Sequence, residues 1–293
     1  MKTRSSLVIA VVLGLSLLVL SGCGKHKGTH ERTNVPRAAK TFSAFSPLKF
    51  SYIDEYGEKK DIPFYRNEAV LEMLSSIQRT GIPEDVDPVE KHSLQKLRYA
   101  LQQLYGKNAD QSPFRAVALL RELADVKKPY APDNWKRVEL ECHMTAKYVL
   151  SLCYQDGVGV PKDLDKGLNL LKEACFYDQF GCYEDRFGWG SDLDDVVFPL
   201  AALEMSVRLL GGIDVNPHLV KGIVLLDYVQ DNGNAIANSI QKKLYEVLPR
   251  DQSEFPERFQ HYETPKRMIY GFEGVSVLDI TKMLARERKS KEE

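Results

Sequence analysis

The sequence lacks an excess of charge of either sign. Its 293 residues contain 40 lysines and arginines against 41 aspartates and glutamates, a formal net charge of −1. Proteins that bind nucleic acid through its phosphates usually carry a marked basic excess. The composition therefore argues against nucleic acid as a partner, while a hydrophobic content of 43% is ample for a buried core.

Catalytic and cofactor-binding motifs are also missing. There is no His-Glu-x-x-His, no Gly-x-Ser-x-Gly and no phosphate-binding loop. Ser-x-x-Lys begins at Ser46, Ser93 and Ser239, but no Ser-Asp-Asn or Lys-Thr-Gly accompanies it. His143 and His218 fall at the start of predicted helices, where a surface or capping role is expected. We therefore expect a protein that is not an enzyme and needs no cofactor.

Long apolar runs are confined to the first 22 residues, which are predicted to be a signal peptide. Lys2 and Arg4 precede the apolar run LVIAVVLGLSLLVL, whose 14 residues are too few for a membrane span. It ends in Leu20-Ser21-Gly22-Cys23, which resembles a bacterial lipobox with cleavage before Cys23. The resemblance implies acyl chains on Cys23, which would anchor the mature chain stably. Gly24 in place of Asp favours the outer membrane, with the protein on its periplasmic side.

Residues 23–47 are predicted to be the lipidated cysteine and a flexible tether. The tether is polar, has no apolar period and carries five basic residues against one glutamate. Such positive charge suits anionic headgroups. His26 and His30 lie in this flexible basic segment and are not assigned to a metal site.

Residues 48–89 are predicted to form an N-terminal cap. Leu48, Phe50 and Tyr52 alternate with polar residues, and a turn can follow at Gly57. A small β-hairpin is therefore expected, with Pro63 placing its second strand at an edge. Residues 67–80 show the amphipathic pattern of a helix.

The most regular pattern is AKYVLSLCYQDGVGVPKDLDKGLNLLKEA, residues 146–174. Apolar residues recur at i, i+3, i+4, i+7 and i+8 from Ala146, which predicts a helix. Gly157 and Gly159 turn the chain, and Pro161 suits the start of a second helix. Each helix has one apolar face, so the pair must bury both faces against each other and against neighbours.

Two further copies of this hairpin can be aligned. At an offset of 55, residues 146–174 lie without a gap on residues 201–229, and Gly157 falls on Gly212. Upstream, residues 99–101 align with residues 148–150. Residues 115–124 then align with the second helix, after a turn two residues shorter. A further amphipathic run ending at Leu248 predicts a capping helix.

The shared register Lys-Gly-(Leu/Ile)-x-Leu-Leu resembles Sel1-type repeats, which are related to tetratricopeptide repeats. The resemblance covers about residues 93–248 and implies an all-α fold, an αα-hairpin solenoid of about three Sel1-like repeats in residues 90–250. The N-terminal cap with its β-hairpin precedes it, and residues 251–293 form a C-terminal cap and charged tail. An unrelated helical bundle is the alternative.

A long insertion, residues 177–197, separates the second and third hairpins. It holds five aromatic residues and six acidic residues against one arginine. Because long loops of repeat proteins often carry function and aromatic side chains make binding hot spots, it is the candidate partner-binding site. The residues assigned to that site are Tyr183, Phe187, Trp189, Asp192, Asp194 and Asp195. In the alternative, the aromatic residues pack back over the hairpins as a structural plug.

Apart from Cys23, four cysteines remain, an even number that suits an oxidising compartment. Cys142 and Cys153 lie on one predicted helix about 16 Å apart, too far for a disulfide. The spacing of Cys175 and Cys182 resembles that in cysteine-rich Sel1-repeat proteins of Helicobacter, which implies a Cys175–Cys182 disulfide. A Cys142–Cys175 disulfide across the hairpin is the alternative, and Cys153 suits a buried thiol.

Sel1-repeat lipoproteins are often encoded beside secreted antibacterial phospholipases of type VI secretion systems, which they neutralise as immunity proteins. The resemblance therefore implies a lipid-anchored, periplasm-facing solenoid that binds a protein, such as a lipase toxin. One alternative is a general envelope scaffold. The other is a penicillin-binding or β-lactam-hydrolysing enzyme like the cysteine-rich relatives, which the missing motifs disfavour.

Overall fold

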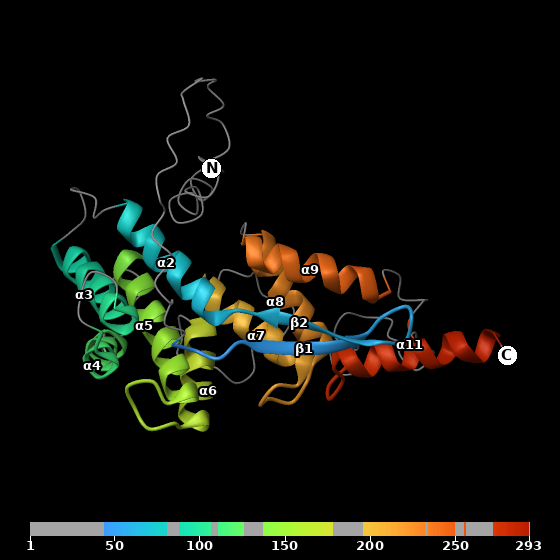
Figure 1. Cartoon of the computed structure of the whole chain (residues 1–293). Coiled ribbons are helices and arrows are strands. Elements are labelled where there is room, and N and C mark those ends of the chain that lie inside the picture. The colour runs from blue at the N-terminus through green and yellow to red at the C-terminus, as the bar shows by residue number, and fades with distance from the viewer. Residues whose placement is uncertain are drawn as a thin grey trace, which may run out of the picture. The chain divides into compact units, whose positions relative to one another are not determined.

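Three helical hairpins follow one another along the chain (Figure 1). Their helices are α3 (Pro88–Tyr105) and α4 (Pro113–Ala124), α5 (Arg137–Asp156) and α6 (Leu164–Cys175), and α7 (Pro199–Gly211) and α8 (Leu219–Asp231). The computed structural model describes residues 44–80, 88–106, 111–125, 137–177, 196–231, 234–249, 255 and 272–292. All of them belong to one unit, Ala44–Glu293. The predicted helical solenoid of about three repeats is confirmed.

The turns of the three hairpins share one backbone geometry. In each, an amide donates to the carbonyl nine residues earlier: Ser112 N to Gln103 O at 2.8 Å, Asp163 N to Tyr154 O at 2.8 Å, and His218 N to Leu209 O at 2.9 Å. In each, the glycine after the first helix is left-handed: Gly106 at φ 68°, Gly157 at 74° and Gly212 at 64°. The predicted equivalence of Gly157 and Gly212 is confirmed, and neither aligned window contains a strand.

These bonds correct the alignment of the first hairpin. Gly106 corresponds to Gly157, so both helices of this hairpin align at an offset of 51 and the turn is not shortened. Leu97, not Tyr99, then corresponds to Tyr148. Similar Tyr and Leu residues dominated the sequence match, whereas the fold equates the glycine that ends the helix.

A small residue in each second helix lets the two helices of a hairpin approach closely. A Cβ on Gly167 would lie 2.6 Å from Gln155 Cγ, and one on Gly222 would lie 2.7 Å from Leu210 Cγ. These two pairs are related by the same offset of 55. In the first hairpin the corresponding residue is Ala116, which is fully buried.

The predicted β-hairpin is present. Strands β1 (Leu48–Ile53) and β2 (Lys59–Phe64) are antiparallel, from Leu48↔Phe64 to Ile53↔Lys59. In this two-stranded sheet β2 has a free edge, and Pro63, Lys59 and Lys60 protect it against pairing with another strand.

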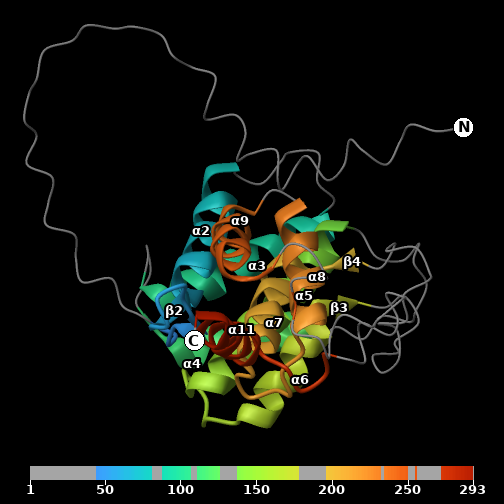
Figure 2. The same cartoon turned by 90° about the vertical axis from the view of Figure 1, so that its right-hand side faces the viewer.

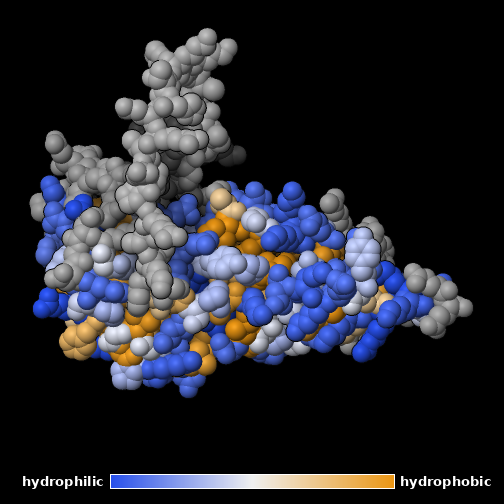
Figure 3. All heavy atoms as spheres, viewed as in Figure 1, coloured by the Kyte–Doolittle hydropathy of each residue, from blue (hydrophilic) through white to orange (hydrophobic). Residues whose placement is uncertain are grey.

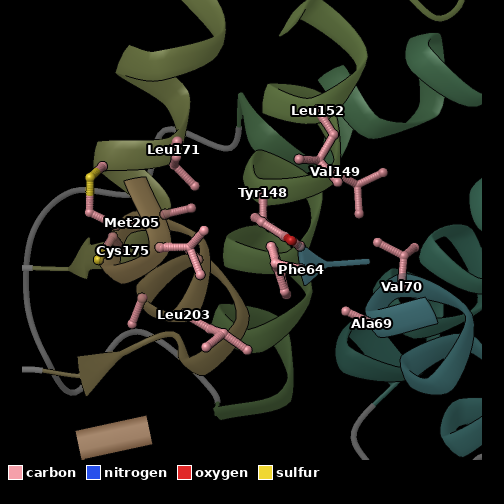
Figure 4. Packing of buried hydrophobic residues seen from close by; sticks show 14 of the residues in the cluster. Phe64, Ala69, Val70, Tyr148, Val149, Leu152, Leu171, Cys175, Leu203 and Met205 are labelled. Carbon is pink, nitrogen blue, oxygen red and sulfur yellow. The ribbon is translucent and has the colours of Figure 1, made fainter. Parts of the chain in front are cut away.

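The β-hairpin does more than cap the first repeat. Strand β1 packs against α7 and against α11 (Val277–Glu292), and Ile53 N donates to Thr281 Oγ1 at 2.9 Å. Figure 2 looks along α11 beside α7. Helix α2 (Arg66–Thr80), also predicted, contacts α3. The β-hairpin and α2 together therefore reach from the first to the third hairpin. Phe50, Ile62 and Phe64 form the apolar side of the β-hairpin, and their almost complete burial favours this arrangement. Figure 4 shows Phe64 reaching toward Tyr148 of α5.

The remaining elements close the insertion and the end of the stack. Strands β3 (Phe176–Tyr177) and β4 (Val196–Val197) pair antiparallel, so the insertion leaves and returns at one point. Helix α9 (Ala235–Val247) confirms the predicted capping helix, and Asn234 Oδ1 caps it by accepting from Ala237 N at 2.9 Å. In the part of the chain that the structure describes, no helix is long and apolar enough to span a bilayer.

Candidate functional site

The first helices of the three hairpins are linked in order: α3 contacts α5, and hydrogen bonds from Tyr148 to Glu204 and from Arg208 to Gln155 join α5 to α7. We call the surface of these three helices the first-helix face. Solenoids commonly bind partners on the face that such stacked elements line. Here the chain's own residues 44–66 cover part of it. Besides the contact of β1 with α7, Ser46 N donates to Asp156 Oδ2 at the end of α5 at 2.6 Å.

Arg66, at the start of α2, ties this segment to the second and third hairpins. Its side chain is only 2% exposed. Nη2 donates to Asp156 Oδ1 and Oδ2 at 3.1 and 2.8 Å, Nη1 to Gln155 Oε1 at 2.8 Å, and Nε to Ser46 O at 2.6 Å. Glu204 Oε1 lies 3.7 Å from Nη1. A buried guanidinium requires such partners because an unpaired buried charge is very costly.

Arg208 in α7 is a second buried guanidinium beside it. Its Nε and Nη2 donate to Glu204 Oε1 at 3.1 and 3.0 Å, and Nη2 also donates to Gln155 Oε1. Nη1 donates to Asp214 Oδ2 at 2.9 Å. Asp214 has φ 58° and occupies the position of Gly159 in the second hairpin, which has φ 71°. Asp tolerates this left-handed backbone better than most residues, and here its carboxylate completes the pairing of Arg208.

Gln155 and Tyr148 complete what we call the Arg66–Arg208 cluster. Gln155 Oε1 accepts from both arginines, whereas its Nε2 is buried and has no hydrogen-bond partner among the described residues. Tyr148 OH donates to Glu204 Oε2 at 3.3 Å. Burial raises the pKa of Tyr148 well above its usual value, and the charge of Glu204 adds to this.

The Arg66–Arg208 cluster is arranged as a clamp. Its two guanidinium groups face three carboxylates, and both are engaged by carboxylate, amide or carbonyl oxygens. Because their N–H donors are used in these hydrogen bonds, the two guanidinium groups have little capacity left to bind another anion. The cluster therefore fixes residues 44–66 across the first-helix face.

All six residues assigned to the partner site, Tyr183, Phe187, Trp189, Asp192, Asp194 and Asp195, lie outside the described residues, as do Cys23, His26 and His30. What the structure adds is that the pairing of β3 with β4 holds the two ends of the insertion together. The assignment of the insertion as a binding site stays a prediction.

The described cysteines are buried. Cys142 and Cys153 lie on α5, as predicted. Cys175, at the end of α6, forms no disulfide with either of the other two described cysteines, so the alternative Cys142–Cys175 disulfide is not formed. Cys182 lies outside the described residues, and the Cys175–Cys182 disulfide stays a prediction. Burial raises the pKa of Cys153 to about 12, which keeps this thiol protonated and unreactive.

The two histidines differ from each other. His218 caps α8 as expected, since its Nδ1 lies 3.4 Å from Lys221 N, but it is buried. His143 does not start a helix: it lies inside α5, and its Nδ1 is 3.0 Å from Leu123 O at the end of α4. The helix begins at Arg137, one and a half turns earlier than the pattern suggested. Among the described residues, no group of His, Cys, Asp and Glu could hold a metal ion.

No member of the Arg66–Arg208 cluster was predicted as a site residue from the sequence. Glu204 and Arg208 carried a usable signal, because they are i, i+4 partners and the charged residues of an otherwise apolar helix, PLAALEMSVRLLG. Arg66 carried no such signal, since its side-chain partners Gln155 and Asp156 lie 89 and 90 residues away along the chain.

Comparison with known proteins adds little. No protein-family model matches the sequence, and no curated protein matches it. Among solved structures, the chain is similar to a Sel1 repeat protein from Oxalobacter formigenes, with 17% identity and a TM-score of 0.39. The similarity covers 64% of this chain and 62% of that one, less than two thirds of its length. The repeat architecture therefore rests on the three equivalent turns.

Proposed function

We propose that this protein is a lipid-anchored, periplasm-facing solenoid that binds a protein partner and has no catalytic activity. The observation that carries the proposal is the threefold repetition of one helical hairpin with equivalent turns. Stacked hairpins present an extended surface that suits binding of another macromolecule.

The anchoring part of the proposal rests on the sequence. The lipobox Leu20-Ser21-Gly22-Cys23 is followed by a polar tether, and the repeats begin far from the anchor. A tether of about 20 residues can span up to roughly 70 Å when extended, at about 3.3–3.6 Å per residue. This length would let the solenoid meet a partner at or near the outer membrane.

The partner we propose is a secreted toxin that acts in the periplasm, such as an antibacterial phospholipase. An immunity protein anchored at the membrane would be placed where a phospholipase acts. The acidic, aromatic insertion, whose ends are joined by β3 and β4, is suited to enter a basic or apolar groove.

Growth protection tests this function. A phospholipase gene next to the gene of this chain would be expressed with a periplasmic signal, alone and together with this protein. The proposal expects the toxin to stop growth and the protein to restore it. Full toxicity in the presence of this protein, or a neighbourhood without any toxin gene, would refute the immunity role.

A further inference from the structure

Helix α4 exposes a stripe that the core does not explain. Phe114, Ala118 and Arg121 follow at i, i+4 and i+7, so they lie on one side of the helix, and all three are exposed. Phe114 is 76% exposed, an unusual position for a large apolar side chain. Figure 3 shows apolar surface at the lower left, where Figure 1 places α4.

Two cations converge beside this stripe on one tyrosine. Arg121 Nη2 donates to Tyr154 OH at 2.7 Å, and the Arg121 guanidinium carbon lies 5.6 Å from the centre of the Tyr154 ring. Lys166 of α6 places its Nζ 4.4 Å from the same ring centre. Tyr154 is nearly buried and forms the floor, whereas Arg121 and Lys166 are exposed. Both cations are held against the same tyrosine although they repel each other.

Neither cation has a carboxylate partner among the described residues, in contrast with other lysines on the same hairpins. Lys96 pairs with Glu122 at 2.9 Å and Lys147 with Glu173 at 2.8 Å. The local field is positive: burial raises the pKa of Tyr154, but hydrogen bonds and charge from Lys166 and Arg121 outweigh it, so the net pKa is lowered. An incoming carboxylate would therefore meet two preorganised cations at once.

The geometry points to a protein-docking surface formed by Phe114, Arg121, Tyr154 and Lys166, which takes a partner segment with an acidic side chain beside a large apolar one. We call it the α4 patch. Phe114 packs on the apolar residue, and Arg121 and Lys166 bind the carboxylate. Aromatic residues and arginine are enriched at binding hot spots, and Tyr154 fixes both cations in place before binding. The inference rests on the proposed protein-binding function and names one of its contact surfaces.

A random dodecamer peptide library tests the surface. It is selected on the mature chain carrying Cys23→Ala, which keeps it free of lipid. Selected peptides are expected to carry Asp or Glu beside a large apolar residue. Their Kd should rise about tenfold or more in Arg121→Gln/Lys166→Gln, and also in Phe114→Ser. Two variants serve as matched controls, Lys242→Gln/Lys243→Gln on α9 and Tyr99→Ser on α3, because they remove exposed cations or an exposed aromatic elsewhere. The Kd of the selected peptides for these two controls should stay within about twofold of their Kd for the chain without these changes.

Each of the following results would overturn the proposal that the α4 patch docks a protein segment. Peptides whose binding ignores Arg121 and Lys166 would refute this surface but leave the protein-binding function standing. Displacement of the peptides by millimolar inorganic phosphate would reveal an anion site only. Binding to phosphatidylglycerol vesicles that is lost in Arg121→Gln/Lys166→Gln, with no peptide selected, would assign the patch to lipid. Melting curves of all variants verify folding, so that a loss of affinity is not a loss of structure. The growth test remains an independent measure of immunity.

Discussion

At the residue scale, the stability of the first-helix face depends on charges that are almost fully buried. Glu204 is fully buried and is contacted by Arg66, Arg208 and Tyr148. Breaking such a group by removing one partner leaves another charge buried without compensation, which costs more than the intact group contributes.

Glu204→Met should therefore lower the free energy of unfolding by about 3–5 kcal/mol, because Arg208 and Arg66 lose a shared carboxylate. The double variant Glu204→Met/Arg208→Met should lose less than the sum of the two single variants, since it removes both charges. Urea unfolding of the three variants measures this. A loss below about 1 kcal/mol for Glu204→Met would show that the cluster is not essential for stability.

His218 gives a pH dependence with a defined sign. Burial, together with the charge of nearby Lys221, lowers its pKa to about 4 against the opposing effect of Glu273. The unfolded chain binds the proton near pH 6.5, so the free energy of unfolding should fall as pH drops from about 6.5 to about 4.

His218→Asn keeps a side-chain acceptor for Lys221 N but does not titrate, so its stability should fall less steeply over this range. Urea unfolding at several pH values compares the two proteins. The lowered pKa of His143 adds a slope of the same sign to both, and the difference between them isolates His218. If the free energies of unfolding of the two proteins fell in parallel as the pH drops, the lowered pKa of His218 would be contradicted.

The residues of the candidate site were the part that the sequence predicted least. A cap such as His218 depends on its neighbours in the chain, and the pattern of helix starts indicated it. Arg66, Gln155 and Glu204 meet only because β1 and β2 cross the first-helix face. No local pattern encodes contacts at that separation.

At the element scale, the turn and the small residue in the second helix define the repeat. The sequence predicted the second and third hairpins correctly because they align without a gap at one offset, with Gly157 on Gly212 and Val160 on Val215. It misaligned the first helix of the first hairpin by two residues because similar Tyr and Leu residues dominated the match there. The hydrogen bond spanning nine residues shows the true register.

Gly167→Ala and Gly222→Ala test this element directly. The added Cβ of Gly167→Ala would lie 2.6 Å from Gln155 Cγ and 3.0 Å from Ser151 O, so the helices must separate. Each change should cost about 1–3 kcal/mol. Asn169→Ala, at an exposed position of α6, is the control and should be neutral or slightly stabilising. Stabilisation by either glycine variant would mean that the two helices do not pack as described.

The insertion can be tested with two further variants. If it binds a basic partner, replacing Asp192, Asp194 and Asp195 by Asn should slow association and weaken its salt dependence, with little effect on stability. Trp189→Ala should speed dissociation, by about 2 kcal/mol or more for a hot spot. Binding kinetics and melting temperatures of both variants distinguish the partner-binding site from the structural plug. Lost stability with unchanged affinity would support the structural plug and remove the insertion from the site.

At the scale of the whole molecule, a stack of repeats whose first-helix face is partly filled follows the N-terminal segment that we predict to be an anchor and a tether. Residues 44–66 occupy part of the surface that a solenoid usually offers. Periodicity predicted the stack and the β-hairpin, but it contained no information about where the β-hairpin would lie. The docking of β1 on α7 and α11 directs attention to other surfaces, the insertion and the α4 patch.

Cys23→Ala tests the anchor. The variant should leave the membrane fraction, or persist as a precursor with its signal peptide, because no acyl chains can be attached. Fractionation and gel mobility of the two proteins in the native bacterium measure this. A variant that fractionates and migrates like wild type would show that the protein is not a lipoprotein.

The central claim is that the solenoid binds and neutralises a protein. The most direct test is isothermal titration of the mature chain carrying Cys23→Ala with a purified phospholipase whose gene lies beside that of this chain, as the proposed function expects. The phospholipase activity is followed in the same samples. Binding is expected to be saturable, and the phospholipase activity is expected to fall in proportion to the fraction bound. No binding heat at micromolar concentrations, together with unchanged phospholipase activity, would contradict it.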